Sequence, residues 1–164
     1  KEMINKPDGS WYYEQLDLGY NFRLNDLMSA LGISQLEKLD KFIKEREKIA
    51  KIYNSLLSET SIVIPEQSLD TYSSRHLYII RVPKERNLVF EHLRNNGIGV
   101  NIHYIPIYRQ PFYKKYNYNY NDFPEAEAYY REAISIPIFP GLTKMQQEKI
   151  IKIIQDPPGF QNLF

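Results

Sequence analysis

The 164-residue chain contains no cysteine, which excludes two classes of site. A disulfide framework and a zinc site built on thiolates both require this residue. The chain has only three histidines, His76, His92 and His103, and their positions form no compact ligand motif. We therefore expect no metal site. The lack of cysteine also agrees with a cytoplasmic location, which we expect for this protein.

The chain also lacks long apolar runs and an excess of charge of either sign. No segment approaches the roughly 20 apolar residues that a membrane-spanning helix needs, so we expect no membrane association. With 21 basic and 20 acidic residues, the formal net charge is +1. No overall field therefore attracts a polyanion. The apolar fraction of 43% is ordinary for a globular domain.

Tyrosine, by contrast, is abundant, with 14 residues. The segment 113–121 interleaves tyrosines with lysines and asparagines, a composition that can stack on single-stranded bases. A nucleic-acid site also needs a wider basic surface, and the acidic Asp122, Glu125 and Glu127 follow directly. We therefore interpret this segment as a loop and expect no nucleic-acid partner.

Apolar residues at helical spacing run from Leu24 to Leu57. A pattern of this length is long for one globular helix, so we expect a division or kink at Gly32 or within residues 39–41. Asn25 or Asp26 can cap the first turn. The sequence therefore predicts a helical arm in two parts.

Strand-like and helix-like segments alternate in the remainder of the chain. We expect strands at 76–82, 100–104 and 134–138 and helices at 87–96, 110–116, 124–133 and after Thr143. Gly97 is expected to end one helix, Pro124 to begin another, and Thr143 with Gln146 to form a capping box.

This order of elements predicts an α+β fold preceded by a helical arm. We divide the chain into an interface segment and helical arm (residues 1–58), a small α+β domain (59–155) and a flexible tail (156–164).

The segment Gly19–Asp26, GYNFRLND, combines a turn residue with two polar donors. Asn21 and Arg23 are two positions apart in an extended segment, so their side chains point to the same side. A carboxamide and a guanidinium aimed together suit an anionic group. The alternative is an ordinary loop with a solvated arginine.

The longer run Gly19–Asp40 resembles the DegT/DnrJ/EryC1/StrS family of pyridoxal-phosphate-dependent sugar aminotransferases. Within that family it is similar to the UDP-4-amino-4,6-dideoxy-N-acetyl-β-L-altrosamine transaminases of pseudaminic acid synthesis. Five further segments support the resemblance, in family order and at family-like spacing over residues 8–154: Asp8–Gln15, His76–Tyr78, Gly97–Tyr108, Ala133–Pro137 and Phe139–Thr143.

The resemblance implies a place in a larger enzyme. In this family a large N-terminal domain carries the lysine that forms a Schiff base with pyridoxal 5'-phosphate, far ahead of the segment matched by Gly19. We therefore expect this chain to be the C-terminal part of a fold-type I aminotransferase, without the catalytic lysine and inactive by itself. The complete enzyme would be a homodimer that transfers an amino group from glutamate to a nucleotide-linked 4-keto-6-deoxy sugar.

The resemblance also assigns candidate site residues. Asn21 would contact the cofactor phosphate across the dimer interface, with Arg23 supplying charge or holding the loop. His103, Tyr104 and Tyr108 would line the substrate pocket, with Tyr108 as a lining residue and not a proton carrier. No nucleotide-binding glycine loop or serine nucleophile motif competes with this interpretation. A non-catalytic ligand-binding or scaffold domain is the alternative from a different class.

Overall fold

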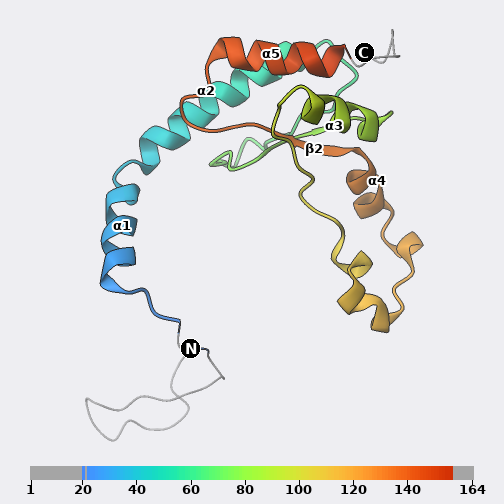
Figure 1. The fold of residues 1–164 in the computed structure, drawn as a ribbon, viewed down its shortest axis with the longest axis horizontal. Helices are drawn as coiled ribbons and strands as arrows, with labels where there is room; N and C mark the ends of the chain where they lie inside the picture. The colour runs from blue at the N-terminus through green and yellow to red at the C-terminus, as the bar shows by residue number, and fades with distance from the viewer. Residues whose placement is uncertain (1–19, 21, 157–164) are drawn as a thin grey trace, which may run out of the picture. The chain divides into compact units, whose positions relative to one another are not determined.

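The structure is a computed structural model that describes residue 20 and residues 22–156 (Figure 1). The chain divides into two compact units, Lys1–Lys38 and Leu39–Phe164. The predicted tail, apart from its first residue, lies outside the described residues. Each unit is considered by itself below.

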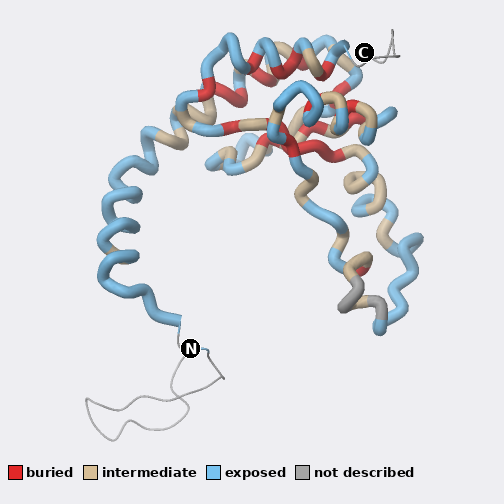
Figure 2. The backbone as a smooth tube through the Cα atoms, in the orientation of Figure 1, coloured by how far each residue is buried: buried red, intermediate tan, exposed pale blue. Residues whose placement is uncertain are grey.

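The described part of the first unit is dominated by helix α1 (Asp26–Leu36). The Asn25 carboxamide accepts a hydrogen bond from the Met28 backbone N–H at 2.9 Å, so the predicted cap is confirmed for Asn25. Apolar side chains lie on all sides of this helix, and none is buried (Figure 2). Leu27 is 83% exposed and Leu31 is 56% exposed. The helix therefore has apolar surface that the described residues do not cover.

The second unit begins with helix α2 (Leu39–Leu57), which follows a turn at residues 37 and 38. The predicted division of the arm is confirmed, and it lies between the two positions proposed for it, Gly32 and residues 39–41. Ile49, Tyr53 and Leu57 of α2 are buried, and the helix packs against α5 (Lys144–Gln155). The apolar face of α2 is therefore covered by other elements of this chain.

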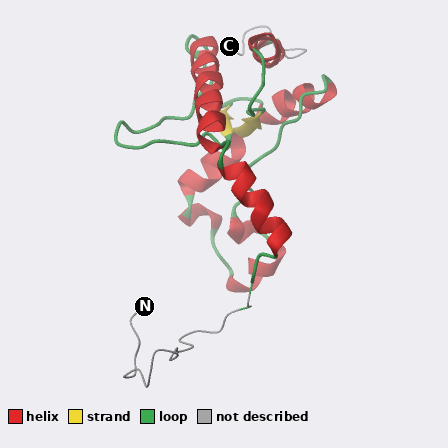
Figure 3. Ribbon diagram, turned by 90° about the vertical axis from the view of Figure 1, so that its left-hand side faces the viewer, coloured by secondary structure: helices red, strands yellow, loops and turns green. Residues whose placement is uncertain are grey.

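The sheet consists of β1 (Tyr78–Arg81) and β2 (Ala133–Ile136), paired antiparallel with Tyr78 opposite Ile136 (Figure 3). β1 lies within its predicted segment, 76–82, and β2 begins one residue before its predicted segment, 134–138. The predicted strand at 100–104 is wrong, because only Asn101 pairs with Ser135, in an isolated bridge. The Asn101 carboxamide accepts from the Ile102 backbone N–H at 2.8 Å and so diverts that donor from a longer ladder.

Helix α3 (Arg86–Asn95) closes the core together with α2, α5 and the sheet. Gly97, with φ of 75°, ends α3 as predicted, in the left-handed region that favours glycine. The predicted capping box also forms, with Gln146 N–H donating to the Thr143 hydroxyl at 3.3 Å. The largest fully buried side chains of the core come from all these elements: Tyr53, Leu57, Tyr78, Ile80, Val89, Leu93, Ile134, Gln147 and Ile154.

Residues 107–132, here called the lobe, connect the bridged segment to β2. They form three short 3₁₀ helices, η1 (Ile107–Arg109), η2 (Pro111–Tyr116) and η3 (Tyr120–Asp122), followed by helix α4 (Pro124–Glu132). Pro124 opens α4 as predicted. The helix expected at 110–116 is a 3₁₀ helix.

Candidate functional site

His103 is held in place from two sides. Its Nδ1 lies 2.7 Å from the hydroxyl oxygen of Ser135, which β2 presents at the bridged position opposite Asn101. The hydroxyl of Tyr129, on α4, donates to the main-chain carbonyl of His103 at 3.1 Å. A serine hydroxyl can donate to or accept from an imidazole nitrogen, so this contact orients the ring in either tautomer. The imidazole is therefore oriented before any ligand binds.

Tyr104 follows directly and is oriented outward. Its side chain is 72% exposed, and its ring meets the His103 imidazole edge-on with centroids 4.7 Å apart. An exposed phenol beside an oriented imidazole offers a stacking surface and hydrogen-bonding groups. The structure thus brings together two of the three residues predicted to bind substrate.

Tyr108 is in a different environment, 8% exposed within the lobe. Its hydroxyl donates to Glu127 Oε1 at 2.9 Å, and its ring stacks on Phe123 with centroids 4.5 Å apart. Arg109 forms a fork to the same carboxylate, with Nε donating to Oε1 at 2.8 Å and the second nitrogen to Oε2. Tyr108, on η1, is therefore fixed through its ring by Phe123 and through its hydroxyl by Glu127 of α4.

The charges in this network shift one another's ionisation. The hydrogen bonds from Arg109 and Tyr108 hold the pKa of Glu127 below its ordinary value, with the Arg109 contribution the larger. Burial raises the pKa of the Tyr108 phenol, and the hydrogen bond to Glu127 raises it further. At neutral pH the carboxylate is charged and the phenol is neutral, which is the combination that the geometry requires.

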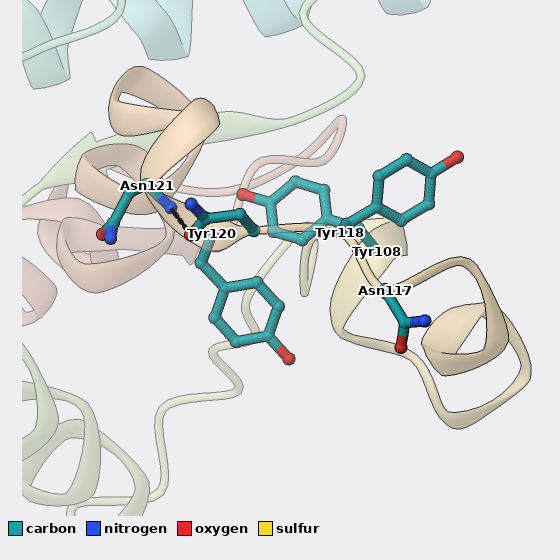
Figure 4. A pocket seen from close by; sticks show the side chains of 6 residues that line it. Tyr108, Asn117, Tyr118, Tyr120 and Asn121 are labelled. Carbon is teal, nitrogen blue, oxygen red and sulfur yellow. Dashed lines mark hydrogen bonds between the residues drawn. The ribbon is translucent and has the colours of Figure 1, made fainter.

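Tyr108 is one of the residues that line a pocket of about 580 Å³ (Figure 4). The other lining residues all belong to one loop and its short helix: Asn117, Tyr118, Asn119, Tyr120 and Asn121. Among the described residues, no hydrogen bond or ring contact joins Tyr108 to His103 or Tyr104. The three predicted substrate residues therefore occupy two separate places in this chain.

The two predicted cofactor residues belong to the first unit. Asn21 lies outside the described residues. Arg23 lies in the irregular segment before α1 and is exposed. An exposed guanidinium has the charge and donor geometry that fit a phosphate group, so the residue present is compatible with the cofactor.

Sequence reasoning missed the residues that orient these groups. Ser135 is the one polar residue in the apolar run Ala133–Ile136, a signal that could have identified it. Glu127 was noted only as an acidic neighbour of the tyrosine-rich segment, because its pairing with Arg109 spans 18 residues. Within residues 20 and 22–156, no group of three or more potential ligands could hold a metal ion. No helix in that part of the chain is both long enough and apolar enough to cross a membrane.

The chain matches the DegT/DnrJ/EryC1/StrS aminotransferase family over residues 3–155. A curated relative, an uncharacterized protein of Methanocaldococcus jannaschii, is 36% identical over 154 residues. The UDP-4-amino-4,6-dideoxy-N-acetyl-β-L-altrosamine transaminase of Campylobacter jejuni is 39% identical over 132 residues, or 77% of this chain. The alignments cover 39% and 35% of those relatives, so the chain spans well under half of their length.

Solved structures resemble this one over most of its length. Helicobacter pylori PseC, an aminotransferase of pseudaminic acid biosynthesis, superposes with a TM-score of 0.76 at 30% identity, over 89% of this chain and 40% of PseC. The apo form of the putative sugar aminotransferase Spr1654 of Streptococcus pneumoniae superposes with a TM-score of 0.78 at 30% identity, over 91% of this chain and 39% of that chain.

Proposed function

The chain belongs to the DegT/DnrJ/EryC1/StrS aminotransferase family, and from this premise we propose that it forms the C-terminal portion of a sugar-nucleotide transaminase. The complete enzyme uses pyridoxal 5'-phosphate and transfers an amino group from glutamate to a nucleotide-linked 4-keto-6-deoxy sugar, as in pseudaminic acid synthesis. The observation that carries this proposal is the match over residues 3–155 combined with 39% identity to a transaminase of that substrate class.

The chain's own residues have supporting and binding roles in this proposal. Asn21 and Arg23 bind the phosphate of the cofactor, which supplies the electron sink for amino transfer when bound. His103 and Tyr104 donate to or stack on the sugar nucleotide, and Tyr108 lines the substrate side of the lobe. The exposed apolar surface of α1 packs against the rest of the polypeptide or the second subunit of a homodimer.

The direct test uses the complete protein that contains this chain. Incubation with pyridoxal 5'-phosphate, glutamate and a UDP-linked 4-keto-6-deoxy sugar is expected to yield the 4-amino sugar nucleotide by mass spectrometry. Binding of the sugar nucleotide without amino transfer would instead support the rival, a ligand-binding or scaffold domain. The coding sequence upstream of Lys1 provides an independent check, since the proposal requires an in-frame large domain with its lysine.

Variants separate the two predicted roles. Asn21→Ala in the complete protein is expected to weaken cofactor retention by about 1–3 kcal/mol, the scale of a hydrogen bond to a charged group. Asn95→Ala, an exposed asparagine at the end of α3, serves as the matched control. Tyr104→Phe is expected to raise the KM for the sugar nucleotide while leaving the half-reaction with glutamate unchanged. Equal damage to both half-reactions would contradict the substrate role of Tyr104.

The 164-residue chain by itself is proposed to be inactive. Incubation with pyridoxal 5'-phosphate followed by borohydride is expected to leave no single lysine labelled stoichiometrically. Stoichiometric labelling of one lysine would overturn this part of the proposal. Because α1 exposes apolar side chains such as Leu27, the isolated chain is also expected to self-associate.

A further inference from the structure

The pocket in the lobe is lined by uncharged side chains of only two kinds. Three tyrosines and three asparagines surround a volume of about 580 Å³, and none of these described lining residues carries a formal charge at neutral pH. This volume is in the range of small-molecule sites, roughly 300–1,000 Å³. Aromatic faces and carboxamides together suit a ligand that has both an apolar face and many hydroxyl or amide groups.

One wall of this pocket is rigid. Tyr108 is clamped by its stack on Phe123 and by its hydrogen bond to Glu127. The Arg109 guanidinium lies 4.7 Å from the Tyr120 ring centroid, so the carboxylate network also supports Tyr120 from behind. The wall therefore keeps its shape without a ligand, which reduces the entropy lost on binding.

The loop that forms the other walls is also ordered by its own hydrogen bonds. Asn119 caps η3, and its side chain accepts from the Asn121 backbone N–H at 3.1 Å. Asn117 adopts φ of 53°, a left-handed conformation that asparagine tolerates. Figure 4 shows the side chains of Tyr120 and Asn117 pointing to the same side of this loop.

Several polar groups of the pocket are left for a ligand. Within the part of the chain that the structure describes, the carboxamides of Asn117 and Asn121 and the hydroxyls of Tyr118 and Tyr120 have no side-chain hydrogen-bond partner. Tyr118 is 47% exposed and Tyr120 is 40% exposed, which is high for large aromatic rings within a cluster. These groups are neutral donors and acceptors placed around the accessible rings of Tyr118 and Tyr120.

We propose that this pocket binds a neutral sugar ring, with the ring's apolar C–H face against the tyrosines and its hydroxyl and acetamido groups on the asparagines. The described lining residues offer no cation to a phosphate or diphosphate, and Arg109, which lies against Tyr120, is paired with Glu127. The proposal rests on the proposed function only for the choice of an N-acetylated pyranose as the probe.

The test is a titration of the 164-residue chain with N-acetylglucosamine, in which binding is monitored by ¹H–¹⁵N NMR. Saturable shifts are expected in the backbone and side-chain amides of residues 117–121. Uridine and inorganic phosphate are titrated in parallel. If these amides show saturable shifts with uridine or phosphate but not with N-acetylglucosamine, the pocket is a base or anion site and the proposal is wrong. The absence of shifts with all three probes would also contradict the proposal.

Matched tyrosine variants locate the site. Tyr118→Ala is expected to weaken binding roughly tenfold, the scale of one aromatic contact. Tyr72→Ala removes a tyrosine that is 71% exposed in a different loop and is expected to have no effect. Equal weakening by both variants would place the sugar elsewhere. If Tyr118→Ala disturbs the lobe, Asn121→Asp keeps the loop's shape while changing a lining donor, and unchanged sugar affinity in that variant would contradict the proposal.

Failure here and failure of the proposed function are distinguishable. The NMR titration needs no cofactor, glutamate or turnover, so a chain that binds no sugar in the lobe leaves the transaminase assignment intact. Conversely, a complete protein that transfers no amino group leaves sugar binding by the lobe to be measured independently.

Discussion

The core and the lobe of the second unit are adjacent along the chain but are held together by different interactions. In the core, α2, α3, α5 and the sheet bury apolar side chains such as Leu93 and Ile154, which are fully inaccessible to solvent. In the lobe, Tyr108, Arg109 and Glu127 connect short 3₁₀ helices through ring stacking and a charged hydrogen-bond network. Apolar burial is non-directional and does not depend on ionisation, whereas the lobe depends on one carboxylate staying charged.

The difference has a functional meaning. A region built from directional contacts around half-exposed tyrosines can present fixed polar groups to a ligand. The core, which is built from apolar packing, supplies the stability on which the lobe depends. The predictions below test this division, from the largest expected effect on global stability to the smallest.

The largest effect is expected from a truncation in the core. Leu93→Ala should reduce the free energy of unfolding by about 2–5 kcal/mol, because a fully buried leucine leaves a cavity when truncated. Urea denaturation followed by circular dichroism measures this change. Leu69→Ala, at a fully exposed loop position, is the control and should change stability little. Similar losses from the two variants would contradict the assignment of the core.

A smaller effect is expected from removing one polar contact of the core. Tyr53→Phe should cost about 0.5–1.5 kcal/mol, since the Tyr53 hydroxyl donates to the Pro137 carbonyl at 2.9 Å. Burial also raises the pKa of Tyr53 and of its neighbour Tyr78 above the ordinary value of 10. The stability that depends on their neutral forms is present below pH 10 and lost above it, and Tyr53→Phe should weaken that alkaline loss. Tyr72→Phe should leave the alkaline profile unchanged.

In the lobe, Glu127→Gln should act locally. The variant loses the charge that Arg109 binds, so amides of residues 107–132 should exchange hydrogen faster while those of the core do not. Because the pKa of Glu127 is lowered in the folded state, its contribution is present above pH 4.5 and is lost as pH falls further. Acid should therefore loosen the wild-type lobe before the core.

Glu125→Gln, an exposed position in the first turn of α4, is the control for this experiment. Acid loosening that persists unchanged in Glu127→Gln, or a uniform increase in exchange across the core, would show that the lobe is not an independently ionisation-dependent region.

The smallest effect on stability is expected at Ser135. Ser135→Ala removes the hydroxyl 2.7 Å from His103 Nδ1 and should change the hydrogen bonding of that imidazole, visible in its ¹⁵N chemical shifts. Ser135→Thr, which keeps the hydroxyl, should restore the wild-type spectrum. An unchanged His103 spectrum in Ser135→Ala would mean that Ser135 only fills space between core and lobe.

Local features of the fold were predictable from the sequence because their causes lie within a few residues. Asn25 caps α1, Gly97 ends α3, Pro124 opens α4, and Thr143 with Gln146 forms the capping box. Each depends on contacts within about four residues or on one residue's own backbone preference. The assignment of His103, Tyr104 and Tyr108 to the substrate pocket rests on the family resemblance and stays a prediction.

Only the tertiary structure decided which apolar faces are covered and which polar groups are oriented. Apolar residues recur at helical spacing in both α1 and α2, yet Tyr53 of α2 is buried by distant elements and Leu27 of α1 is exposed. Likewise, the partners of His103 and Tyr108 are Ser135 and Glu127, 32 and 19 residues away. Such contacts form only when folding brings distant segments together, so they cannot be predicted from the local sequence pattern. These contacts fix the geometry of the candidate site.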